Sequence, residues 1–231
     1  MSIKSPHAFF ITGTDTDAGK TFAACSILAA AGQQGLTTAA IKPVAAGVIY
    51  TPQGRMNEDV LQLSQYCSSS LPSEVMNPVC FDQPIAPHIA ADKAGRRLFA
   101  GELAMACQQV LVTGADLTLI EGAGGWKVPL NDTETMADIA RYLALPVILV
   151  VGMRLGCLNH ALLTVQAIEA DGLKLAGWMA NQTACRMDFY QENLETLKRL
   201  LSIPLLAEIP SSSSPEAAAS SIRIETLLSQ D

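Results

Sequence analysis

The sequence of 231 residues is short of aromatic residues, of positive charge and of long apolar runs. Phe, Trp and Tyr make up 5% of it, and 15 Lys and Arg face 22 Asp and Glu, which gives a formal net charge of −7. A nucleic-acid partner would require clustered Lys and Arg, so this balance argues against one. No segment reaches 18 uninterrupted apolar residues, and no long apolar stretch precedes the first candidate strand. We therefore expect no export signal, no membrane partner and a cytoplasmic protein.

The cysteines lack the spacing of a metal site or a disulfide framework. The chain has six, without a C-x-x-C pair: Cys25, Cys67, Cys80, Cys107, Cys157 and Cys185. This pattern favours reduced and mostly buried thiols. The 49% of hydrophobic residues supply enough material for one substantial core. We expect a single α/β domain over residues 1–231.

Residues 8–21, AFFITGTDTDAGKT, predict a buried strand that runs directly into a phosphate-binding loop. At such a junction, backbone N–H groups and the helix dipole converge on an anion. Lys20 can then reach the outer phosphates, and the Thr21 hydroxyl can bind Mg²⁺. The alternative is a glycine turn that ends in Gly-Lys-Thr by chance, but strand, loop and helix follow in the order that the motif requires.

The loop departs from the usual pattern G-x-x-x-x-G-K-[ST]. Thr14 stands where the first glycine belongs, and Gly13 lies one place earlier. The loop also carries Asp15 and Asp17, whose carboxylates would repel a triphosphate unless a metal or a cationic group intervenes. It is therefore a variant of the motif.

Strand-like and helix-like segments alternate along the chain, which predicts a mainly parallel sheet with helices on both faces. The candidate strands are Ala8–Thr12, Thr38–Lys42, Leu117–Glu121, Val147–Val151, Leu175–Asn181 and Leu205–Ile209. The candidate helices are Thr21–Ala31, Asn57–Tyr66, Gly101–Val112, Thr135–Leu143, Asn159–Ala170, Asp188–Leu201 and one after Pro215. Ligands of such sheets collect at the carboxyl ends of the strands. Residues 44–56 and 72–87 are expected to be long loops above that edge.

Two of the strand ends carry charged side chains. Lys42, followed by Pro43, would point at the same crevice as Lys20, although a surface lysine is the alternative. Glu121 ends a strand and precedes a glycine-rich run, as a carboxylate that holds Mg²⁺ does, although a simple turn is the alternative. Asp59 is either a helix-dipole carboxylate or a third oxygen ligand.

The later strand ends predict two more polar contacts. Residues 152–160, GMRLGCLNH, lead from a strand into a helix whose N-terminus suits a carboxylate. Asn181 has a donor and an acceptor for an adenine edge, although an Asn at a strand end is also a common turn former.

Taken in order, these segments resemble the dethiobiotin synthetase family over nearly the whole chain. The resemblance rests on six motifs: GTDTDAGKT (13–21), KPVAAG (42–47), APHIAA (86–91), EGAGGW (121–126), LGCLNHA (155–161) and GWMAN (177–181). It implies a domain of the P-loop NTPase type, with a seven-stranded, mainly parallel sheet. It also implies a homodimer and closure of a cyclic urea from 7,8-diaminopelargonic acid and CO₂, with cleavage of ATP to ADP and phosphate.

The resemblance also assigns roles to individual residues. Catalysis would use Thr16, Lys20 and Lys42. Mg²⁺ would be held by Thr21, Asp59 and Glu121. ATP would contact residues from four strand ends and a late loop: Thr16, Asp17, Ala18, Gly19, Lys20, Thr21, Asp59, Glu121, Gly122, Ala123, Gly124, Asn181, Gln182, Pro210 and Glu216. The diamine would contact Thr16, Lys42, Ala46, Gly124, Gly156, Cys157, Leu158, Asn159 and Tyr190, with the last five on the partner subunit.

Two positions depart from the family pattern. The family often has Ser at the position of Ala46 and Asp at that of Gln182, so the fine contacts to substrate and nucleotide are left open. Two rivals share the variant loop. An amidating enzyme of the cobyrinic acid synthetase type normally carries an added amidotransferase domain, and a partitioning-type ATPase usually has an extra Lys where this chain has Thr14.

Overall fold

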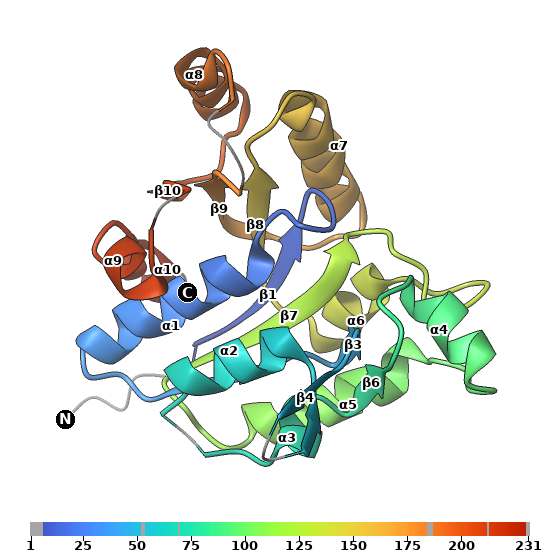
Figure 1. Cartoon of the computed structure of the whole chain (residues 1–231). Coiled ribbons are helices and arrows are strands. Elements are labelled where there is room, and N and C mark those ends of the chain that lie inside the picture. The colour runs from blue at the N-terminus through green and yellow to red at the C-terminus, as the bar shows by residue number, and fades with distance from the viewer. Residues whose placement is uncertain (1–6, 52–53, 69, 184–186, 212, 230–231) are drawn as a thin grey trace.

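The computed structural model describes residues 7–51, 54–68, 70–183, 187–211 and 213–229. Its centre is a six-stranded sheet in the order β10-β9-β8-β1-β7-β2, in which all neighbouring strands are parallel (Figure 1). The strands are β1 (His7–Gly13), β2 (Thr38–Ile41), β7 (Leu117–Gly125), β8 (Val147–Gly152), β9 (Leu175–Asn181) and β10 (Leu205–Ile209). The mainly parallel sheet is confirmed, and β1 lies between two strands made more than 100 residues later.

The sheet has six strands in the described residues where the family resemblance implied seven. After β2 the chain leaves the sheet, because the backbone N–H of Lys42 donates to Met76 O at 2.8 Å and Pro43 has no N–H to donate. The next strand, β3 (Val44–Ala46), instead pairs in parallel with β6 (Val79–Phe81) as a separate two-stranded sheet. This departure carries Lys42 to the edge of the main sheet.

Helices cover both faces of the sheet because the buried strands present apolar side chains alternately to each side. Phe9 and Ile11 face one layer, which contains α1 (Lys20–Gln33), α2 (Glu58–Tyr66), α9 (Pro215–Ala219) and α10 (Ile224–Leu228). The opposite layer contains α5 (Ala100–Leu111), α6 (Met136–Leu143), α7 (Cys157–Ala170) and α8 (Tyr190–Leu200). No helix in the described ranges combines the length and the apolar character needed to span a bilayer.

The two segments that were expected to be long loops contain short elements, so that expectation was wrong. The first holds β3 and a hairpin of β4 (Ile49–Thr51) and β5 (Gly54–Met56). The second holds α3 (Ser73–Met76) and β6, and α4 (Pro87–Lys93) begins at its end. Elements of three or four residues are too short to show a hydrophobic period, which is why the sequence did not reveal them.

The cysteines that the structure describes are all free thiols. Cys25, Cys67, Cys80, Cys107 and Cys157 form no disulfide, and Cys185 lies outside the described residues. Burial raises the pKa of Cys67 to about 11 and that of Cys107 to about 12, so these two thiols stay protonated.

Candidate functional site

A cavity of about 570 Å³ lies at the carboxyl edge of the sheet, above the ends of β1, β2 and β7. Most of the predicted phosphate, metal and catalytic residues line it. The lining comprises Thr16, Asp17, Gly19, Lys20, Thr21, Lys42, Ala46, Asp59, Pro84, Ile85, Ala86, Pro87, Glu121, Ala123, Gly124 and Val128. Residues more than 100 positions apart in the sequence therefore meet in one cleft.

The phosphate-binding loop joins β1 to α1, as its sequence predicted. Gly19 forms the N-cap of α1 with a φ of +80°, and Asp17 also has a positive φ of +57°. A Cβ on Gly19 would lie 1.9 Å from Nδ2 of Asn181, so only glycine fits there. The Lys20 ammonium crosses the loop and donates to the carbonyl oxygen of Asp15 at 3.1 Å. The loop is thus closed by its own lysine.

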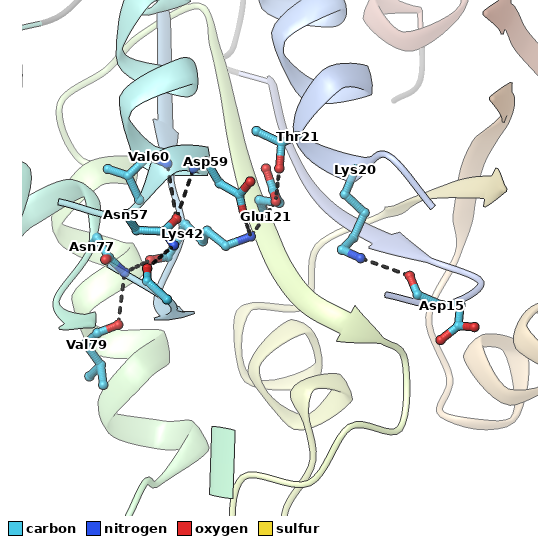
Figure 2. A network of polar contacts seen from close by, with 11 residues as sticks. Asp15, Lys20, Thr21, Lys42, Asn57, Asp59, Val60, Asn77, Val79 and Glu121 are labelled. Atoms are coloured by element: carbon cyan, nitrogen blue, oxygen red, sulfur yellow. Dashed lines mark hydrogen bonds and ion pairs between the residues drawn. The ribbon is translucent and has the colours of Figure 1, made fainter. Parts of the chain in front are cut away.

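Four side chains from four separate segments form what we call the lysine–carboxylate cluster: Thr21, Lys42, Asp59 and Glu121 (Figure 2). The ammonium of Lys42 lies 2.5 Å from Glu121 Oε1 and 2.9 Å from Asp59 Oδ2. The Thr21 hydroxyl donates to the same Glu121 oxygen at 2.8 Å. The second oxygen, Glu121 Oε2, is buried and has no hydrogen-bond partner. An unpartnered buried carboxylate oxygen is costly, so this atom marks a position that suits a cation.

The charges in the cavity shift one another's pKa values. Burial lowers the pKa of Lys20 to about 8, and the nearby charge of Lys42 adds to this effect. Burial alone would lower the pKa of Lys42, but the charges of Glu121 and Asp59 outweigh it and raise that pKa above its ordinary value. Burial likewise opposes ionisation of Asp59, yet the charge of Lys42 holds its pKa below the usual range. Lys42 is therefore a cation at neutral pH.

Two asparagines that sequence reasoning missed hold the cluster in place. Asn57 is buried and caps α2, where its Oδ1 accepts from the backbone N–H of Asp59 at 3.1 Å and its Nδ2 donates to Gly47 O at 2.8 Å. Asn77 donates to the carbonyl oxygen of Lys42 at 2.7 Å. The N-cap role of Asn57 had a sequence signal, since Asn is preferred directly before a helix, whereas Asn77 had none.

One wall of the cavity has no charged side chain and was also missed. It is formed by the residues before and at the start of α4 together with one residue after β7: Pro84, Ile85, Ala86, Pro87 and Val128. Ala46, at the end of β3, lines the cavity without a hydroxyl. The cavity therefore has a charged half and an apolar half.

Several predicted nucleotide residues lie outside the cavity lining. Asn181 is buried beneath the phosphate loop, where its side-chain amide donates to Ala18 O at 2.9 Å. The Glu216 carboxylate accepts a hydrogen bond from the Tyr66 hydroxyl at 2.5 Å. Ala18 and Gly122 are buried, and Gln182 and Pro210 are likewise absent from the lining. The structure thus gives Asn181 a loop-supporting contact that the sequence did not predict.

The predicted diamine contacts at the start of α7 also lie apart from the cavity. We call residues 156–159 the α7 N-terminal segment. Gly156 and Asn159 are exposed, Cys157 is buried, and Leu158 is half-buried. Tyr190 is packed into the core between α7, α8 and the sheet, with 7% of its surface exposed. Within one chain, none of these residues lines the cavity.

Comparisons with known proteins identify the family of the chain. A family model described as an AAA domain matches residues 7–219. The chain is 51% identical over 221 residues to the ATP-dependent dethiobiotin synthetase BioD of Cellvibrio japonicus (strain Ueda107), covering 96% of each chain. It is 51% identical over 222 residues to the protein of that name from Pseudomonas aeruginosa (strain UCBPP-PA14), covering 95% of this chain and 97% of the relative.

Solved structures share the fold at low sequence identity. The signal recognition particle receptor FtsY from Elizabethkingia anophelis in complex with GDP is 12% identical, with a TM-score of 0.55 over 99% of this chain and 65% of that one. Chloroplast FtsY from Physcomitrella patens is 16% identical, with a TM-score of 0.53 over 96% of this chain and 65% of that one. The chain therefore spans just under two thirds of these structures, and the likeness concerns the fold alone.

Proposed function

The chain belongs to the family of ATP-dependent dethiobiotin synthetases, and from that premise we propose how its own residues carry out the reaction. Its activity is the ATP-dependent formation of dethiobiotin in biotin synthesis. The observation that carries our assignment of residues is the lysine–carboxylate cluster, which places a protonated lysine and two carboxylates beside the phosphate loop.

The reaction forms two C–N bonds and cleaves one phosphoanhydride bond. One amine of 7,8-diaminopelargonic acid attacks CO₂ and loses a proton, which gives a carbamate. A carbamate oxygen then attacks the γ-phosphorus of ATP, and ADP leaves. The second amine attacks the carbamoyl carbon, loses a proton and expels phosphate, which closes the cyclic urea. The first step forms an anion and the second brings that anion to the negatively charged γ-phosphate, so the enzyme's task is mainly to stabilise negative charge.

Lys42 and Lys20 supply that positive charge in our proposal. Lys42 stays protonated at neutral pH, because its two carboxylate neighbours raise its pKa, and it lies near the apolar wall where an aliphatic substrate can pack. It would stabilise the carbamate and the transferred phosphoryl group. Lys20, at the first turn of α1, would bind the outer phosphates. Thr16 and the Gly124 backbone, which lie close together in the cavity lining, would contact the diamine.

The cluster also fits Mg²⁺. Thr21, Asp59 and Glu121 offer hydroxyl and carboxylate oxygens, and Glu121 Oε2 has no other partner. In the described ranges no three His, Cys, Asp or Glu side chains form a metal site on their own. A magnesium ion bound by one or two carboxylates and by substrate phosphates needs no such set. Bound there, Mg²⁺ would offset the charge of the β- and γ-phosphates.

The residues outside the cavity would complete recognition of the two substrates. We assign Asn181, Gln182, Pro210 and Glu216 to the base and ribose of ATP. We assign the α7 N-terminal segment and Tyr190 to the carboxylate of the diamine that is bound in the cavity of the partner subunit. The two subunits would then form a homodimer in which each site is built from both chains. Large apolar side chains next to these residues support an interface, because Leu155 is 94% exposed and Phe189 is 74% exposed. Tyr190 requires more rearrangement than Asn159, since its ring is packed within its own subunit.

The decisive experiment measures ADP release with and without the diamine and bicarbonate. We expect ADP formation to require both, because the γ-phosphate is attacked by a carbamate that only the two together can make. Turnover with ATP alone, unaffected by either compound, would contradict the proposal and favour a partitioning-type ATPase. Turnover that depended on glutamine would favour an amidating enzyme instead.

A further inference from the structure

Asp15, in the middle of the phosphate loop, has all three of its oxygens engaged. Its Oδ1 accepts a hydrogen bond from the backbone N–H of Thr16 at 2.8 Å, and its carbonyl oxygen accepts from the Lys20 ammonium at 3.1 Å. Its Oδ2 forms an ion pair with the guanidinium of Arg154. The carboxylate therefore shapes the loop through Thr16, and its charge has a single cationic partner among the described ion pairs.

Arg154 comes from a segment that is joined to the phosphate loop by further contacts. It lies between β8 and α7, and its carbonyl oxygen accepts from the Cys157 N–H at 2.9 Å. Gly152 donates its N–H to the Thr14 hydroxyl at 3.2 Å. A Cβ on Gly152 would lie 3.2 Å from Cα of Ala18, so the two segments are in close contact. Arg154 is thus attached to a support that is fixed against the loop.

The charge of Asp15 matters because the same loop has to hold a triphosphate. Lys20, which would bind the phosphates, is hydrogen-bonded to the backbone of Asp15 itself, so carboxylate and phosphates are near neighbours. A carboxylate within one Debye length of a triphosphate weakens its binding unless a cation offsets the charge. Replacing the carboxylate by an apolar group would remove the acceptor for the Thr16 N–H.

We propose that Arg154 is a positioning residue for nucleotide binding: it neutralises the carboxylate that the phosphate loop needs for its shape, and so preserves the affinity of the loop for ATP. This role rests on the nucleotide site of the proposed function. It differs from a stabilising surface ion pair, because exposed pairs contribute little to folding and both partners are about half exposed. The effect should therefore show in nucleotide affinity more than in stability.

The test measures binding of ADP and of a non-hydrolysable ATP analogue with Mg²⁺ to the full chain by calorimetry, at low salt. We expect Arg154→Ala to weaken binding of the analogue about tenfold, which corresponds to about 1.4 kcal/mol. Arg154→Lys, which keeps the charge, should stay within about threefold of the unaltered protein. The matched control is Arg141→Ala, which removes an arginine of similar exposure from an ion pair with Asp138 and should leave affinity unchanged.

Asp15→Asn separates the proposed role from direct contact with the nucleotide. The amide keeps an oxygen for the Thr16 N–H but removes the charge, so we expect Asp15→Asn and the double variant with Arg154→Ala to bind the analogue equally well. The difference in affinity between the unaltered protein and Arg154→Ala should also shrink as salt rises to 0.5 M, because dissolved ions then screen the charge of Asp15.

Three results would overturn the proposal. The first is an affinity of Arg154→Ala within twofold of the unaltered protein. The second is an equal loss on removing Arg154 in the Asp15→Asn background, which would show that the guanidinium contacts the nucleotide itself. The third is absence of nucleotide binding by the unaltered protein, which would overturn the proposed function as well and is therefore distinguishable from the first two.

Discussion

The lysine–carboxylate cluster and the α7 N-terminal segment lie at the same carboxyl edge of the sheet but are built differently. The cluster is closed within one chain, because Lys42 and Glu121 are buried and each has a charged partner at 2.5 Å. The α7 N-terminal segment has an exposed start, and none of its residues lines the cavity. The first region is assembled from side chains of one chain, whereas the second lies outside the cavity lining of its own chain.

The two regions differ because one would act in the reaction and the other would bind the far end of the substrate. Groups that stabilise a developing charge have to be fixed in a dry environment before the substrate arrives. Groups that bind the far end of a long substrate have a looser requirement, and they can come from another chain. We therefore expect substitutions in the cluster to lower kcat, and substitutions in the α7 N-terminal segment to raise the KM of the diamine.

The largest effect is expected for Lys42→Ala. The variant removes the buried cation beside the site of carbamate and phosphoryl chemistry, so kcat should fall at least about 10²-fold, the scale of losing one charge-stabilising group. Lys20→Ala should lose a similar factor. The matched control is Lys198→Ala, which removes a lysine outside the cavity lining that pairs with Glu195 of α8 and Glu208 of β10. Steady-state ADP release measures all three, and near-normal turnover of Lys42→Ala would remove this residue from the site.

Glu121→Gln should have the next largest effect, through the metal. The amide keeps the shape of the side chain but loses the charge that favours a divalent cation, so the Mg²⁺ concentration for half-maximal rate should rise about tenfold or more. A titration of Mg²⁺ at saturating ATP measures it. An unchanged requirement would exclude Glu121 as a ligand.

Asn159→Ala tests the second region. We expect the KM of the diamine to rise about tenfold while the affinity for ATP stays unchanged, since one donor to a carboxylate is lost at a helix N-terminus. Mixing inactive Lys20→Ala protein with protein altered at Asn159 and Tyr190 then tests whether sites are shared. Recovery of activity is expected once subunits exchange, and exchange without recovery would refute sharing.

The smallest effect is expected for Asn57→Ala, which concerns the support of the cluster. The variant loses the N-cap of α2 and a hydrogen bond to Gly47, so the free energy of unfolding should fall by about 1–2 kcal/mol. Ser214→Ala, which removes the exposed N-cap of the five-residue helix α9, is the matched control and should cost less. Urea denaturation compares the two, and an equal loss in both would mean that burial adds nothing to the cap of α2.

The cluster was the most predictable part of the molecule. Lys42 and Glu121 were each predicted to end an apolar strand, and the rule that parallel strands place their carboxyl ends at one edge brings them to the phosphate loop without any knowledge of packing. In the structure Lys42 directly follows β2, and Glu121 lies within β7. The strands and long helices were predicted for the same reason, since each is long enough to show its period. Most of their ends shifted by one or two residues, as at α7, which begins at Cys157 instead of Asn159. The end of β7 was predicted wrongly by four residues, because the strand continues through the glycine run to Gly125.

The residues of the apolar wall and the hydrogen bond from the Asn181 amide to the phosphate loop could not be predicted. The segment of Pro84 and Ile85 was expected above this edge of the sheet, but it has no period that would indicate which of its side chains line the cavity. The amide of Asn181 reaches Ala18 because β9 happens to end beneath the phosphate loop, a contact between residues 163 positions apart. Contacts set by tertiary packing leave no mark on the local sequence.

That last contact bears on the order in which the protein is made. The phosphate loop precedes in the chain every segment that supports it: β1 pairs with β7 and β8 on its two sides, and the space beside Gly19 is filled by Asn181. At about 5–20 residues per second, roughly 10–30 s of synthesis separate the loop from the residue that packs against it. The segment that binds phosphate is therefore made well before the side chain that packs against it, and β1 lacks its two sheet neighbours until β7 and β8 have been synthesised.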